Sequence, residues 1–532
     1  MKIVLAEKVS PATLEVFAAE SGWQVVTHDQ IKNGLAAELA DADALVVRSA
    51  VQADDELMAA APKLRVIGRA GVGVDNIDAE AATKRGIIVM NTPGANAIAV
   101  AELTIGLMLA LGRKLPQANI SMHAGKWEKK SLAGTELRGK KLGILGLGRI
   151  GLEVARRARA FGMEIVGHDP YVSAAVAREN GIRLATVEEM FREADYLTLH
   201  VGLTPQTTGI VNQKSIATMK KGVRIINCAR GELIVEEALV EGLKSGQVAG
   251  AALDVFSQEP PKDSPFTAFD TVILTPHVAG STAEAQEAVG IQIALQVREY
   301  LKFGVVQNAV NMTSLTHEEY KQLAPYMNVA ERLGQFLGES VTGCLESIHI
   351  AYTGRLAEAK TELIRNSAIK GILAHSDSVN RINAASVAEE RGIRIHEEKV
   401  EAANGGAGSV LTITLHAQSG QSQASATVLH GKHPRLISCD GIDIEAPLEG
   451  TLIYMRNRDV PGVIGRIGTI LGEHNVNIAN FALGRSAVCD GCTPVIALAV
   501  VQVDPPVSQP LLDALLAVEA ITEARFVRLG DA

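Results

Sequence analysis

The chain has 532 residues, of which 47% are hydrophobic, and a formal net charge of -9; this length predicts about three or four domains. The acidic balance and the lack of a tract rich in lysine and arginine argue against a nucleic-acid-binding protein. No apolar run approaches the roughly 18 residues that cross a bilayer, the N-terminus has no signal-peptide layout, and five cysteines fit a reducing compartment, so we expect a cytoplasmic protein.

The first region alternates short apolar strands with helical segments. Strands are predicted at Ile3–Ala6, Ala44–Arg48, Arg65–Arg69 and Ile87–Asn91. This alternation is typical of a doubly wound α/β unit. The apolar segment Ala97–Leu111 is long enough to form a helix that leads into a second unit.

The most informative motif is the glycine-rich segment Gly146-Leu-Gly-Arg-Ile-Gly151. A predicted buried strand, Leu142–Leu145, precedes the motif. A helical pattern follows, whose apolar face consists of Val154, Ala155, Ala158 and Phe161. A second strand, Glu164–Gly167, then leads to Asp169. Strand, glycine turn, helix, strand and acid together are the unit that binds a dinucleotide.

Each part of this unit has a physical role. The first glycine allows the tight turn, the second lets the backbone approach a pyrophosphate, and the third lets the helix pack close to the strand. The start of the helix favours the negative phosphates. Asp169 is placed to accept hydrogen bonds from ribose hydroxyls and would repel a 2′-phosphate, so the sequence predicts NAD as the cofactor.

More apolar strands follow, separated by helical segments, at Tyr196–Val201, Val223–Cys228, Ala249–Asp254 and Val272–Leu274. We therefore expect the dinucleotide unit to cover residues 97–280. A predicted helix, Gln286–Tyr300, is expected to return to the first unit. Residues 1–96 and 281–312 would then form one discontinuous substrate domain.

The C-terminal part divides into two further units. Residues 317–446 are predicted to form a small α/β module, in which we find no chemical motif. Residues 450–532 show the order strand, helix, strand, strand, helix, strand, which predicts a ferredoxin-like βαββαβ unit. Cys489-Asp-Gly-Cys492 supplies only two of the four ligands of a structural zinc. A loop with two thiols is favoured there, and no metal is expected.

Three polar residues follow apolar strands of the dinucleotide unit: Arg230, Glu259 and His277. Open α/β sheets bind ligands at those strand ends. Hydride transfer from a 2-hydroxy acid needs a guanidinium to hold the carboxylate and a histidine to accept the hydroxyl proton. It also needs a carboxylate to orient that histidine. Each residue alone could be an ordinary surface, cap or loop residue, but together they favour a catalytic set.

These motifs give the chain a family resemblance over nearly its whole length. It resembles the D-isomer-specific 2-hydroxyacid dehydrogenases and, within them, the long-type D-3-phosphoglycerate dehydrogenases. The segments that carry the resemblance are Gly68–Asn76, Asn91–Asn96, Gly143–Gly151, Asn227–Gly231, Ala252–Phe256 and Thr275–Ser281. The resemblance implies two Rossmann-like units and NAD-dependent oxidation of 3-phospho-D-glycerate to 3-phosphooxypyruvate, the first step of L-serine synthesis. It also implies a homotetramer, and it leaves open a 2-oxoglutarate reductase side activity, which some relatives have.

The resemblance also implies roles for matching residues. Arg230 would bind the substrate carboxylate, with His277 and Glu259 as the acid–base pair. The NAD-binding set would be Gly146, Gly148, Arg149, Ile150, Gly151, Asp169, Val201, Cys228, Ala229, Arg230, Asp254, His277, Val278, Ala279 and Gly280. The substrate-facing set would be Arg48, Ser49, Gly71, Val72, Gly73, Asn96, Arg230 and His277. Val72 and Val201 stand where the family often has a threonine, so contacts with NAD there are expected through the backbone.

The substrate phosphate needs cationic partners. Arg48 is one candidate. The loop Lys126–Lys130 resembles the family segment that reaches a partner subunit's site, although a solvated basic loop explains it equally well.

The last unit resembles an ACT domain through Arg456–Gly465 and His474–Ile478. In this family such a domain implies L-serine as effector, bound by Asn457, Asp459 and Asn477. The same residues are also ordinary at a turn and a helix start.

Two alternatives to the phosphoglycerate activity remain open. A glyoxylate or hydroxypyruvate reductase of the same family would share the catalytic set, would need no phosphate pocket and usually has no ACT domain. A non-enzymatic NAD sensor that binds partner proteins would also retain these residues.

Overall fold

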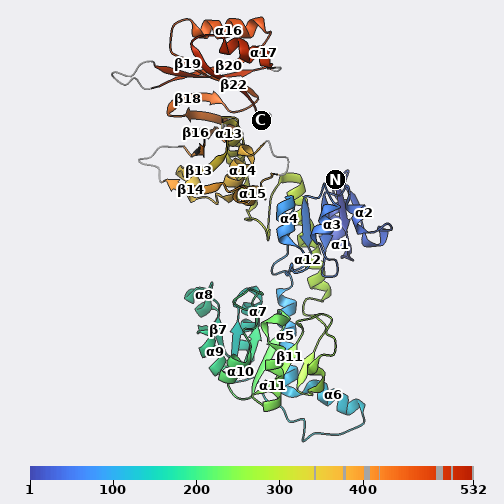
Figure 1. Cartoon of the computed structure of the whole chain (residues 1–532). Helices are drawn as coiled ribbons and strands as arrows, with labels where there is room; N and C mark the ends of the chain where they lie inside the picture. Colours follow the sequence, from blue (N-terminus) through green and yellow to red (C-terminus); the bar gives the residue numbers. More distant parts are fainter. Residues whose placement is uncertain are drawn as a thin grey trace.

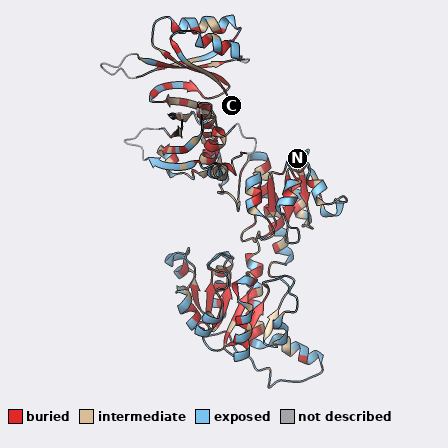
Figure 2. Cartoon of the chain, in the orientation of Figure 1, coloured by how far each residue is buried: buried red, intermediate tan, exposed pale blue. Residues whose placement is uncertain are grey.

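A computed structural model of the chain describes residues 1–340, 343–374, 379–400, 408–418, 420–486, 495–504 and 507–529. Within these residues, four β-sheets follow one another along the chain, and Figure 1 shows their units arranged in an elongated molecule. The buried residues lie in the sheets and on the helix faces that cover them (Figure 2). The Cys489–Cys492 pair lies outside the described residues.

The first sheet is parallel and has the order β2-β1-β3-β4-β5. Its strands are β1 (Lys2–Leu5), β2 (Gln24–Val26), β3 (Ala44–Val47), β4 (Val66–Arg69) and β5 (Ile88–Met90). The helices around it are α1 (Pro11–Ala18), α2 (Leu35–Leu39), α3 (Asp55–Ala59), α4 (Ala79–Arg85) and the later α12 (Ala283–Phe303). One core cluster joins α1 and α12 to one face of this sheet. A second cluster joins α2, α3 and α4 to the other face, so both faces of the sheet are buried.

The second sheet is parallel, with the order β12-β11-β10-β9-β6-β7-β8. Its strands are β6 (Lys141–Leu145), β7 (Glu164–His168), β8 (Ile182–Leu184), β9 (Tyr196–Leu199), β10 (Val223–Asn227), β11 (Val248–Leu253) and β12 (Val272–Leu274). The helices are α5 (Ala97–Arg113), α6 (Leu115–His123), α7 (Arg149–Ala160), α8 (Ala174–Glu179), α9 (Val187–Glu193), α10 (Gln213–Thr218) and α11 (Glu236–Ser245). Helices α5 and α12 connect the two N-terminal units (Figure 1).

The strand order reverses at β6, which pairs with β7 on one side and β9 on the other. This reversal opens a crevice at the carboxyl ends of the strands, where open α/β sheets bind ligands. Val154, Ala155 and Ala158 of α7 are buried, as predicted. The prediction for Phe161 is wrong, because the helix ends at Ala160 and the Phe161 side chain is 43% exposed.

The third unit has a sheet of order β14-β13-β15-β16-β17-β18, with β13 and β14 parallel and the other pairs antiparallel. Its strands are β13 (Leu345–Thr353), β14 (Arg394–Val400), β15 (Val410–Ala417), β16 (Gly420–Leu429), β17 (His433–Cys439) and β18 (Ile442–Pro447). Its helices are α13 (His317–Gly338), α14 (Glu362–Ile372) and α15 (Ala384–Glu390). The buried side chains of α13 and α14 share one core cluster with this sheet.

The last unit has the order β20-β21-β19-β22 and confirms the βαββαβ prediction. Its elements are β19 (Thr451–Arg458), α16 (Val463–Glu473), β20 (Ile478–Arg485), β21 (Ile496–Val503), α17 (Gln509–Leu516) and β22 (Ile521–Arg528). Ile453 and Met455 pack toward the two helices, whereas Leu452 and Tyr454 join the core of the third unit. Because side chains alternate along a strand, one sheet contributes to two cores and ties the last two units together.

Candidate active site

The glycine turn has the geometry of a dinucleotide-binding loop. Gly146 has φ 95°, and a Cβ there would lie 2.5 Å from the carbonyl oxygen of His200. A Cβ on Gly151 would lie 2.0 Å from the carbonyl oxygen of Gly146, so only glycine allows α7 to approach β6 this closely. A Cβ on Gly148 would meet no protein atom within 4 Å. The open space at Gly148 is what backbone approach by a pyrophosphate requires.

Asp169 follows β7 and faces the same turn. One carboxylate oxygen accepts a hydrogen bond from the Leu147 N–H (2.8 Å), and the other accepts one from the Tyr171 N–H (2.8 Å). Asp169 therefore fixes the turn to the end of β7, beside the start of α7. The side chain of Arg149 instead donates a hydrogen bond to the carbonyl oxygen of Pro93, in the first unit.

His277 and Glu259 are in direct contact. The Nδ1 atom of His277 lies 2.6 Å from Oε2 of Glu259, whose Oε1 accepts a hydrogen bond from the Phe256 N–H (3.1 Å). The carboxylate therefore orients the imidazole ring. Because Nδ1 is engaged, Nε2 is the ring nitrogen available to accept a proton.

Asp254 anchors the loop that carries His277. The Asp254 side chain is fully buried. Its carboxylate accepts hydrogen bonds from the Thr275 hydroxyl (2.6 Å) and from the N–H groups of Val278 and Ala279 (both 2.9 Å). In this structure, therefore, Asp254 holds the loop that follows β12.

Arg230 reaches from the second unit to the first. Its Nη2 and Nε atoms lie 3.0 and 3.1 Å from one carboxylate oxygen of Asp75, and its Nη1 donates to the Ala229 carbonyl (2.7 Å). A Cβ on Gly73 would lie 1.9 Å from Nη2 of Arg230, so the guanidinium packs directly against this loop. The Arg230 guanidinium, which the sequence predicted to bind the substrate carboxylate, is thus paired with the Asp75 carboxylate in this structure.

A cavity of about 670 Å³ lies between the two units and contains His277 and Glu259 in its wall. Of the predicted substrate-facing residues, the structure brings Arg48, Ser49, Gly71, Asn96 and His277 into this wall. Within the described residues, Val72, Gly73, Arg230 and the Lys126–Lys130 loop are not part of it. The buried Oδ1 of Asn96 has no hydrogen-bond partner, which leaves an acceptor for a ligand.

Sequence reasoning missed Arg69, which lies at the end of β4 and also lines the cavity. Its buried Nε has no partner, and its Nη1 donates to the Ala70 carbonyl (3.2 Å). Burial lowers the pKa of Arg69, and the positive charge of Arg230 lowers it further. A half-buried guanidinium with a free donor favours binding of an anion. Its position at a strand end, within Gly68–Asn76, was the available signal.

Cys228 and Ala229 lie where β10 ends. Burial, followed by the charge of Asp254, raises the pKa of the Cys228 thiol to about 12. The thiol therefore stays protonated, and Cys228 contributes shape rather than a nucleophile.

A separate cavity of about 380 Å³ lies in the last unit, where β19 leads into α16. It is lined by Asn457, Asp459 and Arg485, among others, and Arg485 Nε lies 3.1 Å from Asp459 Oδ2. The buried Oδ1 of Asn457 has no partner. Asn477 is not in this wall and instead donates to Asp504 (2.7 Å). The structure thus brings together two of the three predicted effector residues.

Comparisons with known proteins divide the chain in the same order. The sequence model of the D-isomer specific 2-hydroxyacid dehydrogenase NAD binding domain matches residues 105–279. The model of the D-3-phosphoglycerate dehydrogenase intervening domain matches residues 322–440, and the ACT domain model matches residues 451–520. Together these matches and the four observed sheets confirm the predicted fold class.

Curated relatives match over most of their length. A D-3-phosphoglycerate dehydrogenase of Methanocaldococcus jannaschii is 42% identical over 91% of this chain and 92% of its own. A D-3-phosphoglycerate dehydrogenase of Bacillus subtilis is 41% identical over 84% of this chain and 86% of its own. Among solved structures, the TT0316 protein of Thermus thermophilus is 33% identical, with a TM-score of 0.53, over 58% of this chain and all of its own. The structure of D-lactate dehydrogenase of Aquifex aeolicus, complexed with NAD and lactic acid, is 27% identical to this chain, with a TM-score of 0.52. The match covers 59% of this chain and 100% of the other.

Proposed function

We propose that Arg230, Glu259 and His277 are the catalytic residues for the NAD-dependent oxidation of 3-phospho-D-glycerate. The chain belongs to the D-3-phosphoglycerate dehydrogenases, within the D-isomer-specific 2-hydroxyacid dehydrogenase family. The contact of 2.6 Å between His277 and Glu259, in the wall of an arginine-lined cavity, carries this proposal. The glycine turn and Asp169 fit NAD, because the turn leaves open space at Gly148 and carries an acid beside it.

The chemistry follows from these positions. When bound, NAD supplies the acceptor for the hydride that leaves C2 of the substrate. His277 Nε2 accepts the proton of the C2 hydroxyl, and Glu259 stabilises the imidazolium that forms. The substrate carboxylate replaces that of Asp75 on the Arg230 guanidinium, so one ion pair is exchanged for another of the same type. Closure of the cavity excludes water that would weaken this pair.

We propose that Arg69, together with Arg48, binds the substrate phosphate, because both guanidinium groups line the cavity. Arg69→Gln is expected to lower kcat/KM for 3-phosphoglycerate by about 10- to 100-fold, the equivalent of one charged hydrogen bond. Activity on unphosphorylated D-glycerate should change little, since it has no phosphate to lose. The measurement is NADH absorbance with both substrates.

The same assay separates the proposal from its alternatives. A wild-type enzyme that prefers glyoxylate or hydroxypyruvate would point to the reductase alternative. An equal loss on both substrates in the Arg69 variant would assign Arg69 to packing. Absence of NADH formation with any 2-hydroxy acid would favour the NAD-sensing alternative.

We propose that L-serine binds the cavity at Asn457 and Asp459, because an unpartnered amide oxygen and a carboxylate there can accept hydrogen bonds from an ammonium group. L-serine is expected to inhibit the wild-type enzyme, and Asp459→Asn is expected to weaken inhibition at least tenfold without altering uninhibited turnover. Asp504→Asn is the control for a carboxylate outside the cavity. Wild-type activity that is unchanged in millimolar L-serine would contradict this assignment.

The other expectations from the sequence stay predictions. They are the domain limits, the homotetramer, the 2-oxoglutarate side activity, the cytoplasmic location and the remaining NAD contacts. Among the described residues, none of the helices combines the length and apolar character that a membrane crossing requires.

A further inference from the structure

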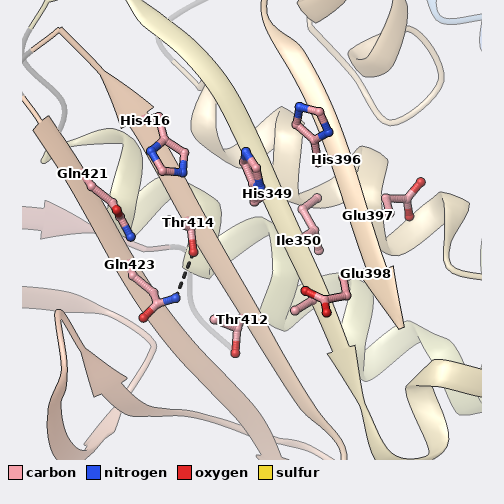
Figure 3. Close-up of a pocket in the computed structure, with 11 residues that line it drawn as sticks. His349, Ile350, His396, Glu397, Glu398, Thr412, Thr414, His416, Gln421 and Gln423 are labelled. Carbon is pink, nitrogen blue, oxygen red and sulfur yellow. Dashed lines mark hydrogen bonds between the residues drawn. The ribbon is translucent and has the colours of Figure 1, made fainter. Parts of the chain in front are cut away.

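Three histidines form a row on the third unit's sheet, and none of them lines the two cavities described above. His349 lies on β13, His396 on β14 and His416 on β15, so each comes from a different strand. The His349 ring centroid is 4.4 Å from that of His396 and 4.8 Å from that of His416. Figure 3 shows His349 between the other two. We call these three residues the histidine row.

The register of the sheet produces this row. His349 and His396 are directly paired across two parallel strands. The neighbours of His349 along β13, Ile348 and Ile350, are buried in the core that contains α13 and α14. Since side chains alternate along a strand, His349 lies on the opposite face of the sheet. The core therefore does not require an imidazole at this position.

The histidine row borders a cavity of about 410 Å³. The uncharged polar residues of its wall are Thr412, Thr414, Gln421 and Gln423, with one hydrogen bond from Gln423 to Thr414 (3.0 Å; Figure 3), and the remaining lining residues are Ile350, Ala351, Glu397 and Glu398. In the part of the chain that the structure describes, none of the three rings has a hydrogen-bond or ion-pair partner. The imidazole, hydroxyl and amide groups thus offer several unpaired hydrogen-bond donors to the same cavity.

Charged groups near the row set its response to pH. His349 is largely exposed, but its partial desolvation lowers its pKa, and the neighbouring charges of His396, His416 and Arg394 lower it further. On β14, both Glu397 and Glu398 line the cavity, and the Glu397 carboxylate already accepts hydrogen bonds from Arg365 and from the Tyr352 hydroxyl. Strand β16, which pairs with β15, contributes the two uncharged glutamines. Clustered imidazoles resist protonation without a counter-charge, and a bound anion supplies one.

We propose that the histidine row and its cavity bind a small dianion, of the phosphate or sulfate type, when the imidazoles are protonated. Binding would then be coupled to proton uptake, so affinity increases as pH falls from 8 to 6. This site is separate from the proposed catalytic cavity, because the two share no wall residue.

The test is histidine modification by diethylpyrocarbonate on the full-length protein, with each site followed by peptide mass spectrometry. Sulfate is the probe, because it stays a dianion over this pH range, and chloride at equal ionic strength is the reference. Sulfate is expected to slow modification of the three row residues several-fold at pH 6 and much less at pH 8. His430, exposed on a turn of the same unit, should be unaffected.

Variants separate the site from general salt effects. His349→Gln should abolish protection of His396 and His416, whereas His430→Asn should retain it; asparagine suits the positive φ of 51° at His430. Equal protection of His430, or no protection in the wild type, would overturn the proposal. If His349→Gln does not fold, His396→Gln on β14 tests the same loss. Because the readout is not activity, failure of the catalytic assignment would leave this result intact.

Discussion

Substitution of His277 by alanine is expected to lower kcat for 3-phosphoglycerate oxidation by about 10²- to 10⁴-fold, the usual contribution of a general base. The variant loses the nitrogen that accepts the hydroxyl proton, while the glycine turn that holds the dinucleotide is untouched. The Kd for NADH should therefore change by less than about threefold, far below the loss that one charged hydrogen bond would cause. Steady-state NADH absorbance and a fluorescence titration with NADH measure the two quantities.

Two further variants sharpen this test. Glu259→Gln should also lower kcat strongly, because the imidazolium loses its counter-charge and an amide N–H that donates to Nδ1 leaves the ring proton on Nε2. His28→Ala removes an exposed imidazole of the first unit and should leave both quantities unchanged. Equal damage to kcat and NADH affinity in the His277 variant would count against its role as base.

The second large effect concerns the glycine turn. Gly148→Ala is expected to leave the free energy of unfolding of the apo-protein within about 0.5 kcal/mol of wild type, because its Cβ meets no protein atom within 4 Å. It should nevertheless weaken NADH binding at least tenfold, since the methyl group would occupy the space through which the backbone approaches the pyrophosphate.

Gly146→Ala is the matched comparison. Gly146 has a φ of 95°, and a Cβ there would lie 2.5 Å from the His200 carbonyl oxygen. An alanine would therefore strain the folded state and lower the free energy of unfolding by about 1–3 kcal/mol. This variant should lose both thermal stability and NADH affinity. Wild-type NADH affinity in the Gly148 variant would rule out the proposed pyrophosphate contact.

Local patterns were sufficient for most of the fold. Leu142–Leu145, the glycine turn and the strand to Asp169 form a continuous stretch of sequence whose geometry is set by neighbouring residues. The βαββαβ order of the last unit could be predicted for the same reason. Two edge strands were missed, β2 and β8, because each is short and contains a polar residue (Gln24 and Arg183), whereas the equally short β5 and β12 are wholly apolar. Phe161 was misplaced because helical periodicity does not show where a helix ends.

The sequence by itself determined the dinucleotide-binding turn, the strand ends that carry Arg230, Glu259 and His277, and the order of the units. Only the tertiary structure decided that Arg69 lines the cavity, that Asp75 engages Arg230, that Asn477 lies outside the effector cavity and that three histidines share one face. The physical reason is that these contacts join residues from different strands or units. Sheet register and the packing between units set such contacts, and neither is encoded in the spacing of residues along one segment.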